Sequence, residues 1–263
     1  MQDMLKSLVS LLKPASQEEL MTRFRRVSHE FKADGSLVTE ADLAMQQRMQ
    51  TKLNQRWPEY TFLAEEMSVS QQQALLDDAD KGMWCLDPLD GTSNYAMGIP
   101  YFAPSLAFIQ GGEVQLGVVY DPLRDECFTA IRGQGAWLND QALKLESNSF
   151  PEQPAIAIID FKRLPARLAA SIASDPPYKS QRSFGSVALD WCWMAAARSH
   201  IYLHGRQNIW DYAAGQLVFS EAGGYSSTLD GEDVFNHQLS ARSAVAAVNK
   251  NLFENWYARL QQA

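Results

Sequence analysis

Residues 84–100, WCLDPLDGTSNYAMGIP, place two aspartates three positions apart with a proline between them. Asp87 and Asp90 offer hard carboxylate oxygens, which suit Mg²⁺ better than softer metals. Pro88 restricts its own φ and pushes the residue before it toward an extended conformation, so we expect Asp87 to end a strand. The stretch therefore predicts a strand that delivers two carboxylates to a turn, where they can hold a divalent metal.

The residues that follow add groups suited to an anion. Gly91 permits a tight turn or a close backbone approach, and Thr92 brings a hydroxyl to the same place. The N–H groups of this turn are then available to an anion. An ordinary strand-to-turn cluster explains the same letters, because Asp-Pro and Asp-Gly pairs are common in loops. The stretch alone does not separate these two interpretations.

Composition limits the class of protein. The chain has 263 residues, of which 46% are hydrophobic and 21% charged. These values are typical of a globular chain with one large domain or two closely packed halves. The net charge of −8 argues against a broad nucleic-acid surface, which needs clustered Lys and Arg. It leaves room for a small anion held through metal ions, whose local charge outweighs the global balance.

Cysteine usage and the N-terminal residues bear on the compartment. Cys85, Cys127 and Cys192 are widely spaced and form no C-x-x-C pair, so neither a zinc site nor a disulfide framework is expected, and a reducing cytoplasm fits. Residues 1–20 lack a basic n-region and are typical of an amphipathic helix rather than a signal peptide. No window approaches the roughly 18 apolar residues of a membrane-spanning helix.

Apolar periodicity predicts an N-terminal half rich in antiparallel strands. Residues 1–31 are expected to be helical, and Thr39 is a candidate N-cap with Asp42 three residues later, before a second helix over 43–53. Gly-Gly at 111–112 and PLRD at 122–125 are expected to be turns between strands. The expected strands span 60–64, 83–87, 104–109, 114–121 and 126–131.

The pattern changes after a Ser-, Asn- and Pro-rich stretch near 147–154. Helices and strands then alternate, which predicts mixed α/β layers. We expect residues 1–147 and 148–263 to be two halves that share one site rather than independent domains. The expected strands span 155–160, 201–205 and 243–249, and the expected helices span 165–173, 186–197 and 210–224.

Four acidic residues stand at predicted strand or helix ends: Glu65, Asp87, Asp90 and Asp211. Asp211 begins an apolar helix, where the helix macrodipole alone would favour an acid by about 0.3–1 kcal/mol. Glu65 and its neighbour Glu66 also fit an ordinary solvated loop. If the four carboxylates converge, their mutual repulsion predicts a bound cation.

Four stretches resemble one known family. Residues 84–100 and WDYAAGQLVFSEAGG at 210–224 resemble the two signatures of the inositol monophosphatase family of Mg²⁺-dependent phosphomonoesterases. KADGSLVTEAD resembles the family's V-T-x-A-D element, and LAEE resembles its G-E-E element with Ala64 in place of the glycine. The stretches occur in the family's order and spread over most of the chain.

The resemblance implies a fold and a metal site. The fold is a mixed α/β, layered α-β-α-β-α sandwich of the inositol monophosphatase and fructose-1,6-bisphosphatase type, assembled as a homodimer. Two or three Mg²⁺ ions are implied. Glu65, Asp87 and the Leu89 carbonyl would hold the first ion, and Asp87, Asp90 and Asp211 the second. Sensitivity to lithium is also implied.

The resemblance further implies roles in catalysis and substrate binding. Backbone N–H groups of Gly91 and Thr92 would receive the phosphate, aided by the positive end of the helix after Asp90. Thr92 and Glu65 would orient and deprotonate the attacking water, with Asp42 behind Thr92. The residues implied to contact the substrate are Leu89, Asp90, Gly91, Thr92, Gly185, Ser186, His204 and Asp211.

One departure from the family concerns substrate choice. Inositol-selective members carry a glutamate where this chain has His204, which is followed closely by Arg206. A histidine can donate, accept or carry positive charge, so a leaving group richer in negative charge or acceptors than inositol is expected. The alternative is that both side chains face solvent or a dimer neighbour.

These expectations favour a cytoplasmic phosphomonoesterase that hydrolyses inositol monophosphate or a similar polyol or sugar phosphate through metal-activated water. The alternatives within the superfamily are a 3′-phosphoadenosine nucleotide, fructose-1,6-bisphosphate or histidinol-phosphate phosphatase. An alternative of another class is a non-catalytic regulatory or interaction protein on the same fold, although the acidic charge makes nucleic acid an improbable partner.

Overall fold

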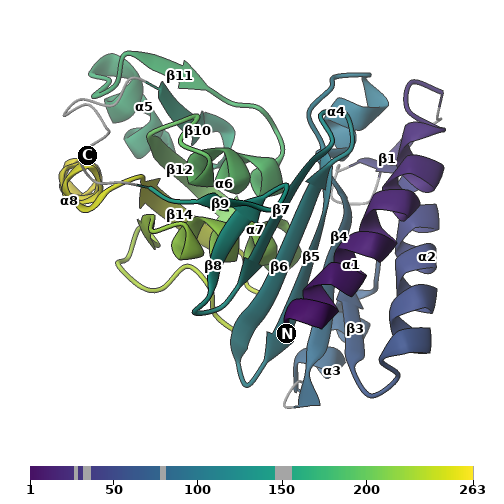
Figure 1. Cartoon of the computed structure of the whole chain (residues 1–263). Coiled ribbons are helices and arrows are strands. Elements are labelled where there is room, and N and C mark those ends of the chain that lie inside the picture. Colours follow the sequence, from purple (N-terminus) through teal and green to yellow (C-terminus); the bar gives the residue numbers. More distant parts are fainter. Residues whose placement is uncertain (27–28, 32–36, 78–80, 146–155, 263) are drawn as a thin grey trace.

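The computed structural model describes residues 1–26, 29–31, 37–77, 81–145 and 156–262, arranged as five layers (Figure 1). The boundary expected at 147/148 and most of the KADGSLV turn lie outside these ranges. None of the helices within these ranges is long and apolar enough to cross a membrane.

Two long helices form the first layer. α1 (Gln2–Ala15) turns its apolar side, including Leu8 and Leu12, inward, and α2 (Glu40–Arg56) packs beside it (Figure 1). The π-helical segment η1 (Ser16–Met21) continues α1. The helix expected to run to residue 31 is wrong at its end, because β1 (His29–Phe31) pairs with β2 (Leu37–Thr39). Arg25 has φ +65°, a left-handed conformation that a right-handed helix does not contain.

A seven-stranded sheet forms the second layer, with strand order β3-β4-β5-β6-β7-β8-β9. β3 and β4 are parallel and every other neighbouring pair is antiparallel. Side chains alternate between two faces, so Trp84 joins the core under α1 and α2 while Cys85 joins the opposite core. The strands are β3 (Thr61–Ala64), β4 (Met83–Asp90), β5 (Ala103–Gln110), β6 (Glu113–Asp121), β7 (Glu126–Ile131), β8 (Gly135–Leu138) and β9 (Gln141–Leu143).

A five-stranded sheet forms the fourth layer, with strand order β11-β10-β12-β14-β13. β10 is parallel to both β11 and β12, whereas β14 is antiparallel to both β12 and β13. The strands are β10 (Ile156–Asp160), β11 (Ser180–Arg182), β12 (Ile201–Gln207), β13 (Tyr225–Ser227) and β14 (Arg242–Ala247).

Helices α6 (Val187–Ala195) and α7 (Ile209–Glu221) form the middle layer between the sheets (Figure 1). Glycine permits the closest approach: a Cβ on Gly117 of β6 would lie 2.7 Å from the Ala214 carbonyl oxygen of α7. α5 (Ala166–Ser174) and α8 (Lys250–Gln261) cover the outer face of the five-stranded sheet (Figure 1). The expected α-β-α-β-α sandwich is confirmed.

Most predicted elements are present with shifted ends. Both expected turns, at 111–112 and 122–125, connect antiparallel strands. Strand β4 continues beyond the expected end at Asp87 to Asp90. The elements that the sequence did not predict are short or peripheral: β1, β2, β8, β9, β11, β13, α3 (Val69–Asp77), the 3₁₀ helix η4 (Phe161–Arg163) and α8.

Candidate active site

The end of β4 and the starts of four helices meet at one end of the molecule. α4 (Thr92–Ala96) follows β4 directly, and α2, α6 and α7 begin nearby with Asp42, Ser186 and Asp211. Hydrogen bonds connect β4, α4, α2 and α6 to one another, although these segments lie far apart in the sequence, whereas the bond of Asp211 lies within α7.

The first connection runs from α2 to Thr92. Asp42 closes a capping box, because its Oδ2 accepts hydrogen bonds from the backbone N–H of Thr39 at 2.8 Å and from the Thr39 hydroxyl at 2.6 Å. Its Oδ1 accepts a hydrogen bond from Thr92 Oγ1 at 3.1 Å. The structure thus confirms both the N-cap at Thr39 and the position of Asp42 behind Thr92.

The second connection is within the β4 turn. Asp87 pairs with Ser105 and Asp90 pairs with Ala103, so β4 carries one extra residue relative to β5. The backbone N–H of Leu89 donates to Asp87 Oδ1 at 2.9 Å, and the Leu89 carbonyl accepts from Thr92 Oγ1 at 3.0 Å. The extra residue explains why the strand continues past Pro88: the bulge absorbs the irregularity that was expected to end it.

The third connection joins the two halves of the chain. Asp90 Oδ2 accepts hydrogen bonds from the Ser186 hydroxyl at 2.5 Å and from the backbone N–H of Ala188 at 2.7 Å. Gly91 has φ +92°, and a Cβ there would lie 3.2 Å from the Gly185 carbonyl oxygen. Glycine is therefore required at position 91 both for conformation and for space.

The fourth connection involves Asp211. Its Oδ2 accepts a hydrogen bond from the backbone N–H of Asn208 at 2.8 Å, which closes a capping box at the start of α7. This is the helix-start role that the sequence already offered for Asp211. The same bond fixes the side chain, because it ties the carboxylate to its own helix end.

Glu65 stands in a turn just after β3. Its backbone N–H donates to the Leu86 carbonyl at 3.2 Å, and Gln72 Nε2 donates to the Ala64 and Glu65 carbonyls at 2.9 and 3.2 Å. Gln46 of α2 accepts the backbone N–H of Glu66 at 3.1 Å. The sequence did not identify Gln46 or Gln72, since a glutamine carries no signal of the turn that it supports.

Burial and mutual repulsion raise the pKa of the carboxyl groups. Burial raises the pKa of Asp87 well above its ordinary range, and the charges of Glu65, Asp90 and Asp211 raise it further. Burial likewise raises the pKa of Asp211, assisted by the charges of Asp90 and Glu65 and opposed by Arg163. The four acids are thus close enough to act on one another's charge.

Hydrogen bonds moderate the same effect at two positions. Burial raises the pKa of Asp90 to about 7, although the bonds from Ser186 and Ala188 lower it. Burial also raises the pKa of Asp42 to about 6, against the bonds from Thr39. Both groups therefore change charge near neutral pH.

The donor chemistry of this cluster fits a divalent cation. None of the ion pairs within the described ranges involves Asp87, Asp90 or Asp211, so no ion pair with a cationic side chain stabilises the charged form of these buried carboxyl groups. Carboxylate and carbonyl oxygens are the ligands that Mg²⁺ prefers. Within those ranges, however, no three His, Cys, Asp or Glu side chains lie close enough together to hold a metal ion as they stand.

His204 lies on strand β12, inside the fold. Its side chain is buried, with 5% of its surface exposed, so the alternative that it faces solvent is wrong. Its Nε2 lies 3.2 Å from Asp160 Oδ2, and its Nδ1 accepts the backbone N–H of Arg206 at 3.2 Å. A contact between His204 and substrate stays a prediction, and it would have to break one of these bonds.

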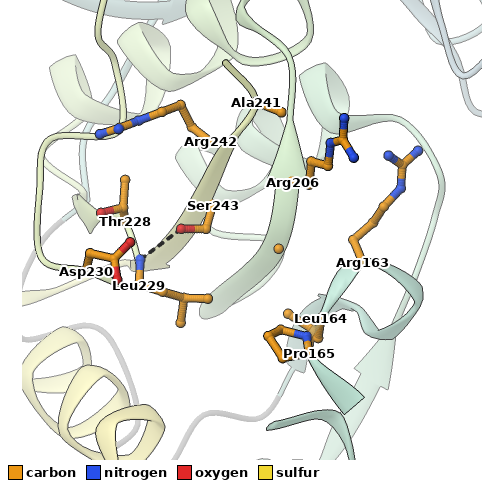
Figure 2. A pocket seen from close by; sticks show the side chains of 11 residues that line it. Arg163, Leu164, Pro165, Arg206, Thr228, Leu229, Asp230, Ala241, Arg242 and Ser243 are labelled. Carbon is orange, nitrogen blue, oxygen red and sulfur yellow. Dashed lines mark hydrogen bonds between the residues drawn. The ribbon is translucent and has the colours of Figure 1, made fainter. Parts of the chain in front are cut away.

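A pocket of about 530 Å³ opens beside His204 (Figure 2). Arg163 and Arg206 lie along one wall, and Thr228, Asp230 and Ser243 belong to the other. The sequence missed Asp160 and Arg163. The signal was present, since Asp160 ends a predicted strand as Asp87 does, but it lay outside the stretches that carry the family resemblance.

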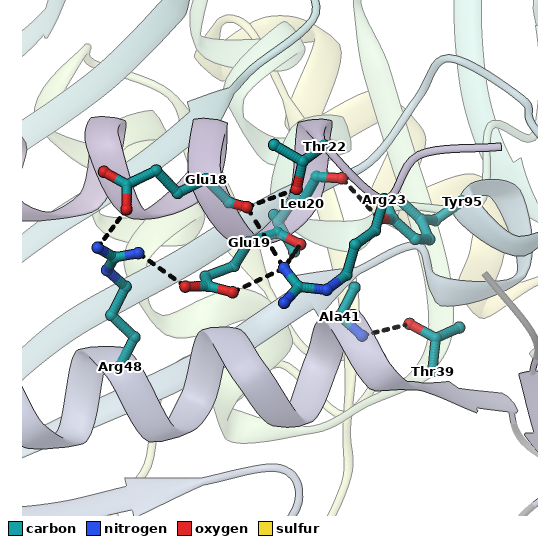
Figure 3. A network of polar contacts seen from close by, with 9 residues as sticks. All are labelled: Glu18, Glu19, Leu20, Thr22, Arg23, Thr39, Ala41, Arg48 and Tyr95. Carbon is teal, nitrogen blue, oxygen red and sulfur yellow. Dashed lines mark hydrogen bonds and ion pairs between the residues drawn. The ribbon is translucent and has the colours of Figure 1, made fainter. Parts of the chain in front are cut away.

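A polar network fixes α2, and with it Asp42 (Figure 3). Arg48 of α2 forms ion pairs with Glu18 and with Glu19, the latter at 2.7 Å, and Glu19 also binds Arg23 at 2.7 Å. The Tyr95 hydroxyl of α4 donates to the Leu20 carbonyl at 2.6 Å. η1 therefore holds both helices that contribute to the Asp42–Thr92 contact.

Comparison with protein families gives one match along the whole chain. The model of the inositol monophosphatase family matches residues 1–263. Inositol monophosphatase 1 of Solanum lycopersicum is 33% identical over 243 residues, which cover 90% of this chain and 86% of the relative. The Nus factor SuhB of Pasteurella multocida (strain Pm70) is 34% identical over 204 residues, which cover 76% of this chain and 74% of the relative.

Solved structures have the same architecture. An IMPase of Thermotoga maritima superposes with a TM-score of 0.85 at 27% identity, covering 99% of this chain and 97% of the other. An IMPase/NADP phosphatase complexed with Mg²⁺ and phosphate superposes with a TM-score of 0.85 at 25% identity. The match covers 100% of this chain and 96% of the other.

Proposed function

The chain belongs to the inositol monophosphatase family, and from that premise we propose that it is a Mg²⁺-dependent phosphomonoesterase acting on a small phosphorylated metabolite. The observation that carries the proposal is the group of mutually repelling carboxyl groups around the β4 turn. Without a cation, the repulsion between these carboxylates destabilises the fold, and a bound divalent cation would neutralise it.

Glu65, Asp87, Asp90, Asp211 and the Leu89 carbonyl are the groups that would hold the ions. Divalent cations supply two things to phosphate ester hydrolysis: they lower the pKa of a bound water, and they stabilise charge on the attacking and leaving oxygens. The bonds described above occupy one oxygen of each of three carboxylates, namely Asp87 Oδ1, Asp90 Oδ2 and Asp211 Oδ2. They restrict each side chain before any ion binds, which reduces the entropy lost on binding.

Thr92 and Asp42 would position the attacking water. The Thr92 hydroxyl has one proton and two acceptors, the Leu89 carbonyl and Asp42 Oδ1, so its lone pairs are left to accept a hydrogen from water. Asp42 has a pKa of about 6 and is therefore ionised at neutral pH. It can accept the Thr92 hydroxyl proton while that hydroxyl accepts a proton from the water. Glu65 is the second candidate base.

The phosphate would be received by backbone N–H groups at the start of α4. Gly91, with φ +92° and no side chain, leaves the N–H groups of the turn open to an anion. Ser186, whose hydroxyl donates to Asp90, would lie on the side of the leaving group. A homodimer and inhibition by lithium are further parts of the proposal that follow from family membership.

Phosphate release by the purified chain tests the proposal. Inositol 1-phosphate and glycerol 2-phosphate are incubated with Mg²⁺ and, in parallel, with a chelator. We expect release that requires Mg²⁺, falls on addition of Li⁺, and is lost in Asp87→Asn. Release that persists in the chelator and in Asp87→Asn would rule out a metal site at the β4 turn.

A second candidate is a regulatory or interaction role, which is favoured by the similarity to proteins named Nus factor SuhB. Every residue expected to bind metal is present in this chain, which supports hydrolysis as the first candidate. A chain that binds Mg²⁺ and releases no phosphate from a broad panel of phosphomonoesters would favour the second candidate.

A further inference from the structure

Asn94 of α4 joins the two halves of the chain beside the β4 turn. Its Nδ2 donates hydrogen bonds to the Phe184 carbonyl at 2.7 Å and to the Tyr101 carbonyl at 2.8 Å, and Phe184 lies 90 positions away in the sequence. Both partners are carbonyl oxygens, so only the NH₂ group of an amide side chain can face them. One nitrogen therefore holds together three segments: α4, the residues before β5 and the residues before α6.

These segments are in close contact because two glycines leave room for them. Gly91 and Gly185 both have positive φ, of +92° and +85°. A Cβ on Gly91 would lie 3.0 Å from the Tyr101 carbonyl oxygen and 3.2 Å from the Gly185 carbonyl oxygen. A Cβ on Gly185 would lie 3.3 Å from Asn94 Nδ2. The Asn94 amide thus lies where the backbones of the two halves approach each other most closely around the β4 turn.

Residues 184–188 are held to the β4 turn at both ends. Asp90 Oδ2 holds one end, because it accepts hydrogen bonds from the Ser186 hydroxyl at 2.5 Å and from a backbone N–H at the start of α6. Asn94 holds the other end through its bond to the first carbonyl of the segment. Gly185 lies between these attachments and has the backbone freedom of glycine, so its conformation depends on both of them.

The role of Asn94 toward a substrate is indirect. In the proposed function, the phosphate lies at the β4 turn and the leaving group lies beside Gly185 and Ser186. Protein carbonyls use both hydrogens of the Asn94 NH₂ group, so none is left to donate to a substrate. The effect of this side chain on a substrate therefore passes through the segments that it holds.

Building on the proposed function, we propose that Asn94 is a positioning residue that fixes the leaving-group side of the site relative to the phosphate side. A phosphate ester occupies both sides, so its turnover depends on their alignment, and a misplacement of about 1 Å can cost roughly 10²-fold in rate. Inorganic phosphate occupies the β4 turn alone. Its affinity is therefore independent of Asn94.

Kinetics of two variants test the proposal. Asn94→Asp keeps the shape of the side chain and removes both N–H donors, and Asn94→Ala removes the whole amide. Asn139→Ala is the control: its amide also donates to a carbonyl, that of Asp125 at 2.8 Å, but it lies between β8 and β9, at the far end of the sheet from β3 and β4. For each protein, thermal denaturation establishes folding. Phosphate release from inositol 1-phosphate and glycerol 2-phosphate gives kcat and KM at saturating Mg²⁺, and inhibition by inorganic phosphate gives Ki.

We expect both Asn94 variants to lower kcat/KM about 10–100-fold while Ki for phosphate stays within about twofold of the wild type. Asn139→Ala should change neither constant. In a Ser186→Ala background, Asn94→Ala should cost less than it does alone, because part of its effect passes through Ser186.

Three results would overturn this role of Asn94: an unchanged kcat/KM, an equal loss of phosphate affinity and of kcat/KM, or effects of Asn94→Ala and Ser186→Ala that simply add. With an active wild type, these results leave the proposed function intact. A wild type that releases phosphate from neither ester nor from other phosphomonoesters contradicts the proposed function itself, and this inference fails with it.

Discussion

Removal of the charge at Asp90 should make the metal-free protein more stable at neutral and alkaline pH. The pKa of Asp90 rises from an ordinary 3.8 in the unfolded chain to about 7 in the folded chain, chiefly because the group is buried. Between these two values the folded state retains a proton that the unfolded state has lost, so stability falls as pH rises through this window. Below the window the group is protonated in both states and costs nothing.

The magnitude follows from the size of the shift. A rise from 3.8 to about 7 corresponds to an upper limit of roughly 4 kcal/mol at 1.36 kcal/mol per unit. Asp90→Asn keeps an oxygen that can accept the hydrogen bonds from Ser186 and Ala188 while it removes the charge. We therefore expect the variant to be more stable than the wild type at about pH 8 and nearly equal to it at about pH 4.

Urea denaturation in the presence of a chelator measures this difference at several pH values. Ser186→Ala is the matched control, because it keeps the carboxylate and removes a donor that lowers its pKa. This control should lose stability at about pH 8 more than at about pH 4. A wild type whose metal-free stability rises between these pH values, or an Asp90→Asn variant that is less stable by the same amount at both, would refute the reasoning.

Three further predictions concern other contacts of the site. Asp42→Asn should lower kcat by about 10²–10⁴-fold and remove the acidic limb near pH 6 from the pH–rate profile, since no group at position 42 would then titrate; a limb that remains would assign it to another residue. Gly91→Ala should cost roughly 1–2 kcal/mol in thermal denaturation because its φ is +92°, and it should lower phosphate release, because the added Cβ would lie 3.0 Å from a carbonyl oxygen. His204→Ala should cost roughly 1–3 kcal/mol, because Asp160 and the Arg206 N–H lose a buried partner; a loss below about 0.5 kcal/mol would mean that His204 behaves as a surface residue.

The sequence predicted the segments of the site because their residue types have local causes. Pro88 and Gly91 restrict or free the backbone by their own covalent structure, and Thr39 with Asp42 is a helix start at any position in a fold. The two hairpin turns at 111–112 and 122–125 have equally local signals. These features depend on neighbours within a few residues, which the sequence displays.

The convergence of the segments could not be derived from such signals. The bond between Asp90 and Ser186 joins residues that are 96 positions apart, and the bond between Thr92 and Asp42 spans 50. Only the family resemblance connected them. Contacts of this kind are set by how the layers pack, which periodicity does not specify.

His204 shows where the resemblance itself was insufficient. The position suggested a side chain that faces the substrate or solvent. The irregularity of β12 between His204 and Gln207 instead places the backbone N–H of Arg206 where it donates to the imidazole ring of His204. Arg25 gives a similar lesson, since nothing in its neighbourhood marks the left-handed residue that ends the N-terminal helical region. Irregular backbone is decided by tertiary contacts and leaves a weak trace in sequence.

Calorimetric titration of the metal-free chain with Mg²⁺, repeated at about pH 7 in buffers of different ionisation enthalpy, most directly tests whether Asp87, Asp90 and Asp211 share divalent cations. Protons held by carboxyl groups of raised pKa must leave when the ions bind, so we expect binding accompanied by proton release, with both reduced in Asp211→Asn. Binding without proton release, or equal affinity in Asp211→Asn and the wild type, would contradict a cation site built from these residues.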